Sequence, residues 1–298
     1  VVYEDRPMNF DAWDIDIYYQ EKGYEVEDLK EVSVEKSSLM TTVKMTWNYE
    51  DSVISQEIRL YNDDRRIDFV THADWHEHQQ LLRVLFPFDI RTSEATFDIQ
   101  YGNVKRPTYE NTSWDMAKFE TVAHQWADYS ETGYGVSLMN DCKYGYSARG
   151  HILGMSLIKC GIYPDYAADQ GSHDFTYALY PHSGSWQESG VQKSAWSLNN
   201  PLWAVAGTLD VESAFCKADT DHVAIDCVKK AEDSDDLIVR FHEYEGMRGP
   251  VTLKFGFPVA SWQETNLCEN PEGEEQTGEL KVTVRPYEIR TFRVTPKK

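Results

Sequence analysis

The sequence has few basic residues for its length. Its 298 residues include 29 lysines and arginines against 50 aspartates and glutamates, which gives a formal net charge of −21. Nucleic-acid phosphates and anionic membrane surfaces both bind clusters of Lys and Arg, so this balance argues against either partner. We interpret the excess acid as a solvated surface that favours solubility. The alternative is an acidic face that meets a basic face on a partner domain.

Long apolar runs, paired cysteines and common catalytic motifs are missing too. No run of 18 apolar residues occurs, which argues against a membrane helix, and no signal segment opens the chain. The five cysteines are odd in number and none has Cys-x-x-Cys spacing, so we predict neither a disulfide framework nor a zinc ribbon. A reducing, cytoplasmic compartment is the simplest account. Nucleophile-elbow, phosphate-loop and dinucleotide motifs are also absent, which argues against those three classes of enzyme.

Alternation of apolar and polar residues is what the sequence does have. Clear examples span residues 41–47, 53–60 and 66–73, with polar turn clusters between them. Strands of this length at about ten-residue spacing are typical of an all-β sandwich. Hydrophobic content of 41% and aromatic content of 13% supply a sizeable core. We predict an all-β fold with a large domain over residues 1–208 and a smaller sandwich over residues 209–298.

The densest group of carboxylates lies in residues 9–19, which also alternate and predict a strand. Asp14 and Asp16 would share a face of this strand, with Asp11 nearby, because side chains two apart point the same way. Glycoside hydrolysis needs two carboxylates that flank the scissile bond. Neighbours on one face cannot flank a bond from two sides, so we expect a solvated or interdomain face.

Motifs of unusual length lie between residues 100 and 182. They read QYG-x-x-x-RPT-x-x-NTSWD from Gln100, FE-x-x-AH-x-W-x-D-x-SE-x-G-x-G from Phe119, NDCKYG from Asn140, and DQGSHDFTYALYPH from Asp169. Together they resemble the C-terminal half of glycoside hydrolase family 38, the α-mannosidases, and its cytosolic branch most closely. Met139 is a departure, because the family pattern has Leu before Asn140. The resemblance extends over essentially the whole chain.

The resemblance implies that the parent protein is a retaining exo-α-mannosidase acting on α-mannosides or oligosaccharides. The chain starts at Val1 without an initiator Met, and we interpret it as a fragment. An absent N-terminal catalytic domain would carry the zinc ion, the aspartate nucleophile and the acid/base carboxylate. This fragment would supply a β region similar to the galactose-mutarotase supersandwich and then a small sandwich.

We expect the fragment itself to contain no catalytic residue, metal or cofactor and to be inactive alone. It would complete the sugar pocket of the catalytic domain of the same chain. A homo-oligomer stays open as a further partner.

Four residues are the predicted substrate contacts. Arg149-Gly150 is similar to an Arg-Gly of the family that lies near the catalytic pocket and helps to hold the sugar. In a loop after strand 136–139, its guanidinium could reach sugar hydroxyls or anchor a carboxylate. Lys143 follows the same strand. Asp169 and His173 belong to a motif that the resemblance matches, and for His173 we favour a role in ordering the loop.

The segment THADWHEH is a weaker candidate for a metal site. His76 and His78 would share a strand face, and Asp74 would join them. Three such ligands could hold zinc. The family's own His-x-Asp metal motif continues as Pro-Gly-Trp, and here Trp75 and His76 follow instead. We therefore expect surface or interface histidines rather than a metal site.

Residues 119–129 allow two secondary structures. Apolar residues recur at helical spacing, with Ser113 as a cap, whereas a strand would run through Phe119, Thr121 and Ala123. The resemblance implies the strand, and we adopt it.

Two other functions stay open. One is a freestanding carbohydrate-binding module, which needs an exposed aromatic platform. The other is a mutarotase-like epimerase, for which His173 and His124 are the candidate acid and base. Glu243 and Arg248 are interpreted as parts of a structural hairpin in the last domain.

Overall fold

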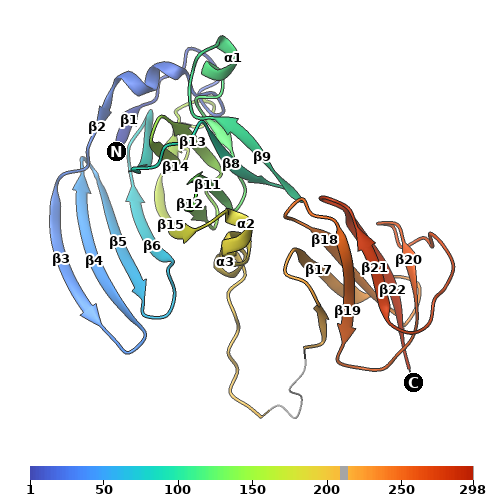
Figure 1. Ribbon diagram of the computed structural model, residues 1–298. Helices are drawn as coiled ribbons and strands as arrows, with labels where there is room; N and C mark the ends of the chain where they lie inside the picture. Colours follow the sequence, from blue (N-terminus) through green and yellow to red (C-terminus); the bar gives the residue numbers. More distant parts are fainter. Residues whose placement is uncertain (209–213, 298) are drawn as a thin grey trace. The chain divides into compact units, whose positions relative to one another are not determined.

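The protein is described by a computed structural model of residues 1–208 and 214–297 (Figure 1). It is 52% strand and 8% helix, which confirms the predicted all-β fold. The chain forms two compact units: unit 1 holds Val1–Ile99 and Asn103–Leu202, and unit 2 holds Gln100–Gly102 and the residues from Trp203 onward. Residues 209–213, where the second predicted domain would begin, lie outside the described residues. No helix in the described ranges is long and apolar enough to cross a membrane.

Unit 1 consists of two antiparallel sheets. The nine-stranded sheet has the order β3-β4-β5-β6-β15-β12-β11-β8-β9, and the six-stranded sheet has the order β10-β13-β14-β7-β1-β2 (Figure 1). The strands of the first sheet are β3 (Leu29–Lys36), β4 (Met40–Tyr49), β5 (Ser52–Tyr61), β6 (Ile67–Trp75), β8 (Glu94–Ile99), β9 (Gly102–Pro107), β11 (Trp126–Glu131), β12 (Tyr134–Asn140) and β15 (Gly171–Ser183). Those of the second are β1 (Val2–Glu4), β2 (Gly23–Tyr24), β7 (Gln80–Pro87), β10 (Thr121–Val122), β13 (Gly145–Arg149) and β14 (Ile152–Cys160).

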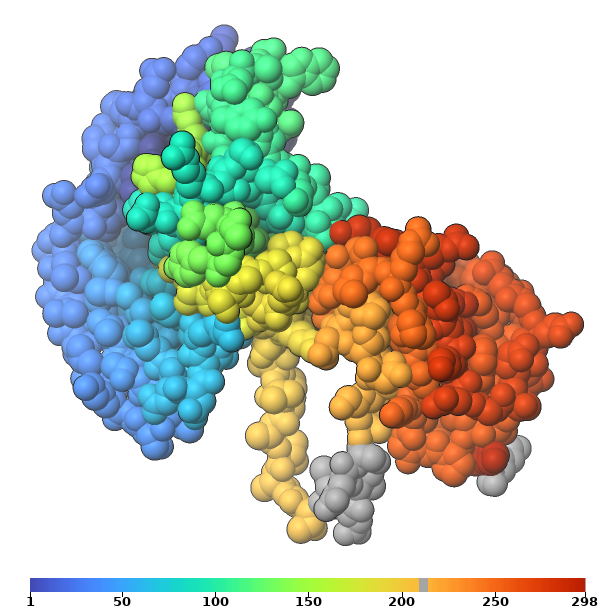
Figure 2. Space-filling view, in the orientation of Figure 1, coloured from blue at the N-terminus to red at the C-terminus, as the bar shows by residue number. Residues whose placement is uncertain are grey.

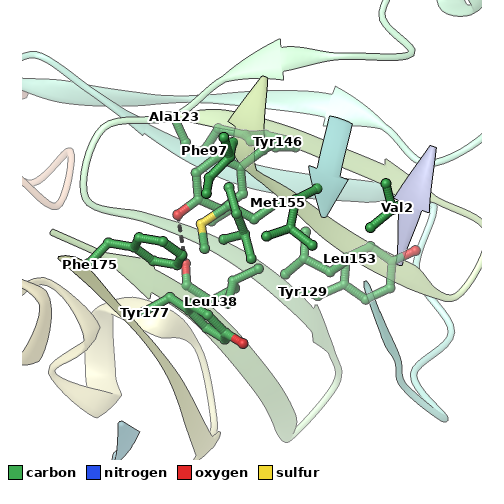
Figure 3. Packing of buried hydrophobic residues seen from close by; sticks show 14 of the residues in the cluster. Val2, Phe97, Ala123, Tyr129, Leu138, Tyr146, Leu153, Met155, Phe175 and Tyr177 are labelled. Atoms are coloured by element: carbon green, nitrogen blue, oxygen red, sulfur yellow. Dashed lines mark hydrogen bonds between the residues drawn. The ribbon is translucent and has the colours of Figure 1, made fainter. Parts of the chain in front are cut away.

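The core of unit 1 is formed by apolar side chains from both sheets (Figure 3). Tyr146 is fully buried, and its hydroxyl is nevertheless satisfied. It accepts a hydrogen bond from Asn140 Nδ2 at 2.7 Å and donates to the carbonyl oxygen of Leu138 at 3.3 Å. A buried hydroxyl without partners would cost free energy, so this arrangement lets a tyrosine fill the core.

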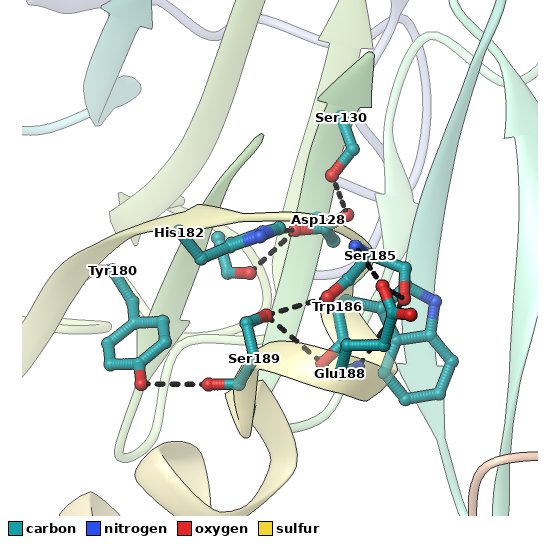
Figure 4. Close-up of polar contacts among 9 residues, drawn as sticks. Asp128, Ser130, Tyr180, His182, Ser185, Trp186, Glu188 and Ser189 are labelled. Atoms are coloured by element: carbon teal, nitrogen blue, oxygen red, sulfur yellow. Dashed lines mark hydrogen bonds and ion pairs between the residues drawn. The ribbon is translucent and has the colours of Figure 1, made fainter. Parts of the chain in front are cut away.

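Two helices that were not predicted, α2 (Trp186–Ser189) and α3 (Val191–Asn199), pack on the part of the opposite face of the nine-stranded sheet that β11, β12 and β15 form. Trp186 packs there against Trp126, with ring centroids 4.8 Å apart. The N-terminus of α2 is a capping box, in which the Ser185 hydroxyl accepts from the Glu188 amide and the Glu188 carboxylate accepts from the Ser185 amide (Figure 4). The two helices are too short to show a clear helical periodicity of apolar residues, so the sequence did not predict them.

A buried polar cluster lies on the same face. Asp128 accepts hydrogen bonds from Ser137 Oγ at 2.7 Å and Ser130 Oγ at 2.5 Å, and His182 Nε2 lies 2.8 Å from its Oδ1 (Figure 4). Gly135 pairs with His182 across the strands. A Cβ at Gly135 would lie 2.2 Å from Ser130 Oγ and 2.5 Å from a ring carbon of His182. Only glycine fits here, because real Cβ atoms do not approach neighbours so closely.

The predicted strand over residues 9–19 is wrong. The amides of Trp13 and Asp14 donate to the Phe10 carbonyl oxygen, which forms a turn, and Ile17–Glu21 form a short 3-10 helix, η1. The carboxylate of Asp16 accepts from the Met8 amide at 2.8 Å. Short acidic side chains can thus bond local amides and compete with a strand ladder.

In the ambiguous segment 119–129 the helical alternative is wrong, and the adopted strand is confirmed in part, because Phe119 and Ala123 lie outside the strands that form. Thr121–Val122 form β10 and Trp126–Glu131 form β11. A one-turn helix, α1 (Ser113–Met116), precedes them. Its cap is Thr112 rather than Ser113, since the Thr112 hydroxyl accepts from the Asp115 amide at 3.2 Å.

Unit 2 contains two further antiparallel sheets, ordered β16-β19-β21 and β17-β18-β22-β20. Their strands are β16 (Cys216–Ala218), β17 (Val223–Lys230), β18 (Leu237–Glu243), β19 (Gly249–Phe255), β20 (Val259–Thr265), β21 (Leu280–Val284) and β22 (Ile289–Pro296). Its core includes the stacked rings of Phe241 and Phe292, 5.8 Å apart. The expected hairpin at Glu243 and Arg248 is wrong, because β18 and β19 belong to different sheets and this segment links them.

Candidate functional site

Of the predicted substrate contacts, Arg149 lies on a cavity of unit 1. The cavity has a volume of about 360 Å³. Its lining residues are Tyr3, Tyr19, Gln20, Arg83, Leu85, Phe119, Ser147, Arg149, His151 and Ile152. Most come from the six-stranded sheet and from the segment around η1, so the cavity depends on residues far apart in the sequence.

Arg149 is the last residue of β13, not part of a loop as expected. It pairs with Ile152 of β14 across a tight turn, in which Gly150 has φ of +61°. Its Nη2 lies 2.8 Å from a Glu110 carboxylate oxygen, and its Nη1 donates to the Gln20 side-chain oxygen. The side chain is still 58% exposed. The guanidinium is therefore held in place on two sides and remains accessible.

One lining residue of the cavity, Arg83, belongs to a buried ion pair. Arg83 contacts the Glu120 carboxylate through Nη1, and the two side chains are only 3% and 12% exposed. Arg83 Nη2 donates to Ser147 Oγ at 2.7 Å, and the Tyr19 hydroxyl donates to Glu120 at 2.7 Å. Burial raises the pKa of Glu120, and the adjacent Arg83 charge offsets part of that rise. Burial also raises the pKa of the Tyr19 hydroxyl, which therefore stays protonated at neutral pH.

The arrangement suits a neutral ligand that carries hydroxyl groups. Each of the two guanidiniums on the cavity has a glutamate partner, so little net charge is left to attract an anion. Arginine has five N–H groups, and the two bonds described for Arg149 leave others for a ligand. Leu85, Phe119 and Ile152 add an apolar wall. An apolar cavity of this size with a few fixed polar groups is typical of small-molecule sites.

The other three predicted residues do not line this cavity. Asp169 and His173 do come together, because His173 Nε2 lies 2.9 Å from the Asp169 carbonyl oxygen. Asp169 has a φ of +57°, and the contact with His173 lies across the bend that leads into β15. The amide of Lys143 donates to Asn140, and its Nζ lies 4.6 Å above the Phe175 ring.

The histidines of THADWHEH do not share a strand face. β6 ends at Trp75, so His76 and His78 fall beyond it. His76 Nε2 lies 3.0 Å from Asp74, and the His78 ring packs on Tyr166 at 4.4 Å. In the ranges that the structure describes, no three His, Cys, Asp or Glu side chains are grouped so that they could hold a metal ion.

His124, the other histidine considered for acid–base chemistry, lies outside the Arg149 cavity as well. Its amide donates to the Asp98 carbonyl oxygen, and its ring lies edge-on to Tyr144 at 6.4 Å. All five cysteines are free.

Sequence reasoning missed Tyr19, Gln20, Glu110 and Ser147 as site residues. One signal was available, namely a single arginine, Arg83, inside the apolar run 81–88. A charge in a buried strand requires a partner and hydrogen bonds, and so marks an organised polar site. The identity of those partners depends on the fold.

Comparisons with known proteins agree with this architecture. Residues 1–167 match the model of the glycosyl hydrolases family 38 C-terminal domain, and residues 222–292 match that of the family 38 C-terminal beta sandwich domain. In fold, the chain is similar to a crystal structure of an α-mannosidase from Enterococcus faecalis V583. The TM-score is 0.74 with 18% identity, over 88% of this chain and 35% of that one.

Curated relatives are more similar in sequence. Alpha-mannosidase G of Dictyostelium discoideum is 36% identical over 98% of this chain and 28% of its own length. Human alpha-mannosidase 2C1 is 37% identical over 97% of this chain and 29% of its own length. The chain thus spans less than a third of the curated relatives that it matches. The chain belongs to glycosyl hydrolase family 38, of which it contains the C-terminal β domains.

Proposed function

We propose that this chain is the C-terminal β region of a retaining α-mannosidase and completes the sugar pocket of an N-terminal catalytic domain. The parent would hydrolyse terminal α-mannosides or oligosaccharides. The observation that carries the proposal is the Arg149 cavity, where a held but accessible guanidinium adjoins polar and apolar walls. The relatives that match this chain along nearly its whole length are named as α-mannosidases.

In this function, Arg149 donates an N–H to a sugar hydroxyl or to a carboxylate of the pocket. Glu110 and Gln20 fix its direction, and the buried pair Arg83–Glu120 supports the strand that carries it. Zinc and the catalytic carboxylates would come from the N-terminal domain. Lys143, His173 and Asp169 remain proposed substrate contacts of the same fragment. The free cysteines and the cytosolic-type resemblance support a cytoplasmic location.

Arg149→Ala should lower kcat/KM of the parent enzyme about ten- to hundredfold. Loss of a hydrogen bond to a charged group costs about 1.5–3 kcal/mol, and about 1.4 kcal/mol corresponds to a factor of ten. The melting temperature should change little, because the side chain is 58% exposed. Steady-state kinetics with an aryl α-mannoside and thermal unfolding measure the two effects.

Two further variants sharpen that experiment. Arg149→Lys keeps the charge but loses the planar fork, so it should recover activity only in part. Lys105→Ala removes an exposed base that pairs with Glu94 elsewhere on unit 1, and its kinetics should match those of the unmodified parent. Unchanged kinetics for Arg149→Ala would show that the arginine is only a surface ion pair.

The isolated chain should not hydrolyse an aryl α-mannoside. Within the acidic group Asp11, Asp14 and Asp16, the carboxylates of Asp11 and Asp16 accept hydrogen bonds from backbone amides, which leaves them unsuited to act from two sides of a bond. Turnover by the purified chain is compared with turnover by the parent at equal concentration. Activity that copurifies with the isolated chain and disappears in Arg149→Ala would contradict the proposal.

A further inference from the structure

Unit 1 exposes a group of large apolar side chains on the segment after β1. We call residues 8–18 the aromatic loop. Met8, Phe10, Trp13 and Tyr18 are 83%, 58%, 66% and 65% exposed in this chain. Phe10 and Trp13 stack on each other, with ring centroids 5.5 Å apart and an interplanar angle of 19°. The N-terminal segment, dark blue in Figure 2, lies at the surface of unit 1. Large apolar groups gathered on a surface mark an interaction site.

The aromatic loop is fastened to the body of unit 1. Asp11 Oδ2 accepts hydrogen bonds from the amides of Ile162 and Tyr163, at 2.5 and 3.2 Å. The Asp11 carbonyl oxygen accepts from Lys159 Nζ at 2.6 Å. A Cβ at Gly161 would lie 3.1 Å from two oxygens of Asp11, so glycine permits this close approach. The exposed rings are therefore carried by a backbone with defined long-range contacts.

The loop also contains a backbone conformation that needs support. Phe10 has a φ of +55°, in the left-handed region that bulky residues rarely adopt. The amides of Trp13 and Asp14 donate to its carbonyl oxygen at 2.9 and 2.8 Å, and the Asp16 carboxylate holds the Met8 amide at 2.8 Å. Such strain persists where the surroundings enforce it, and it concentrates at functional sites. The loop is thus organised before any partner binds, which lowers the entropy cost of association.

We infer that the aromatic loop is the docking surface for the rest of the parent polypeptide, which would cover it with an apolar face. The inference rests on the proposed function, in which this fragment belongs to a larger enzyme. The chain spans only 28% to 29% of the two relatives compared above, and the matching family domain is a C-terminal one. Most of such a parent therefore lies outside this structure and can occupy the surface.

The chemistry of the loop favours a protein face over a sugar or a second copy. Aromatic residues and methionine are enriched at protein interfaces, and tryptophan and tyrosine dominate their binding energy. Met8 is the most exposed member, and its aliphatic side chain suits an apolar protein surface better than a polyhydroxyl ligand. The loop starts a few residues after β1, so the polypeptide that precedes β1 in a parent attaches close to it. This proximity gives an intramolecular partner a high effective concentration.

Hydroxyl-radical labelling of the parent enzyme tests the inference, with mass spectrometry to measure oxidation of each residue. In the native parent, Met8, Phe10 and Trp13 should be oxidised at least about tenfold more slowly than in the parent unfolded in guanidinium. Since these side chains are 58% to 83% exposed in this chain, such protection has to come from outside it. Oxidation at nearly the unfolded rate would overturn the inference.

Two additions to the labelling separate the other occupants. Protection that disappears on hundredfold dilution would identify a second copy of the parent, and protection that requires added α-mannoside would identify a sugar platform. Either result would overturn the inference. Protection unaffected by dilution and by ligand supports it.

A variant pair gives an independent readout. The double substitution Phe10→Ala and Trp13→Ala should weaken docking. A protease should then cut the parent between its N-terminal domain and unit 1 at least about tenfold faster. Trp203→Ala removes a tryptophan that is 93% exposed in the segment after unit 1, and its cleavage rate should stay unchanged. Equal rates for the double variant and the unmodified parent would contradict the inference.

The Arg149→Ala kinetics distinguish the two proposals. A fall in kcat/KM with unprotected rings would leave the proposed function standing and remove the docking surface. Protected rings with unchanged kinetics would leave the docking surface standing and would remove Arg149 from the sugar pocket.

Discussion

Glu120→Ala should lower the free energy of unfolding of unit 1 by about 3–5 kcal/mol, because it leaves a buried charge without its partner. Arg83 is 3% exposed, and its Nε has no hydrogen-bond partner in the structure. Among the described residues, the hydroxyls of Ser147 and Tyr19 are the hydrogen-bond partners that its guanidinium would keep. The loss of unfolding free energy is measured by denaturant unfolding that is monitored through hydrogen exchange of the β7 and β14 amides.

Three controls separate the buried charge from other causes. Glu120→Gln keeps a hydrogen-bond acceptor without the charge and should be less destabilising. Glu94→Ala breaks an exposed ion pair with Lys105 and should cost less than about 1 kcal/mol. Replacing Arg83 and Glu120 together with Met and Leu should recover most of the stability, since apolar residues can substitute for a buried pair. A cost below 1 kcal/mol for Glu120→Ala would mean that water reaches Arg83.

The same substitution should also lower the activity of the parent. Arg83 Nη2 bonds Ser147, which lines the cavity together with Arg149. If the pair only stabilised the core, kcat/KM of the folded fraction would be unchanged. A fall in kcat/KM at a temperature where the variant is fully folded would assign Glu120 a positioning role.

Glu243→Ala should destabilise unit 2 by about 3–6 kcal/mol. The Glu243 side chain is fully buried, and its carboxylate accepts hydrogen bonds from four backbone amides. The donors are Glu245, Gly246, Met247 and Tyr287, at 2.8 to 3.0 Å. Each bond to a charged group contributes about 1.5–3 kcal/mol, and we count two because the freed amides partly rebind water. Hydrogen exchange of the β18 and β22 amides reports the change.

Two matched variants serve as controls for this site. One keeps part of the hydrogen-bonding capacity of Glu243, and the other removes an acid elsewhere in unit 2. Glu243→Gln retains one acceptor oxygen and should lose about half as much stability. Glu274→Ala removes an exposed acid from another loop of unit 2 and should have almost no effect. Exchange rates in Glu243→Ala that match those of the unmodified chain would show that the amides are already solvated.

Much of the strand content could be predicted from the sequence because strand side chains alternate between faces. The alternating residues 41–47 and 53–60 lie within β4 and β5, which pair directly. The apolar run 81–88 similarly forms β7, which lies between β1 and β14. Family membership could also be predicted from the sequence, because motifs such as NDCKYG match the family in residue identity as well as in polarity. Local periodicity and motif identity are properties of the chain itself.

The tertiary structure determines the features that depend on contacts between residues far apart in the sequence. Residues 9–19 alternate like a strand, yet Asp11 binds amides more than 150 positions further along the chain, at Ile162 and Tyr163, and the segment forms a loop instead. The Arg149 cavity likewise needs Gln20 and Glu110, which only folding brings to the end of β13. A hydrogen bond between distant residues depends on the whole backbone path, which no local pattern encodes. The motif around Arg149 therefore indicated a site residue, whereas its partners Gln20 and Glu110 could be identified only in the folded structure.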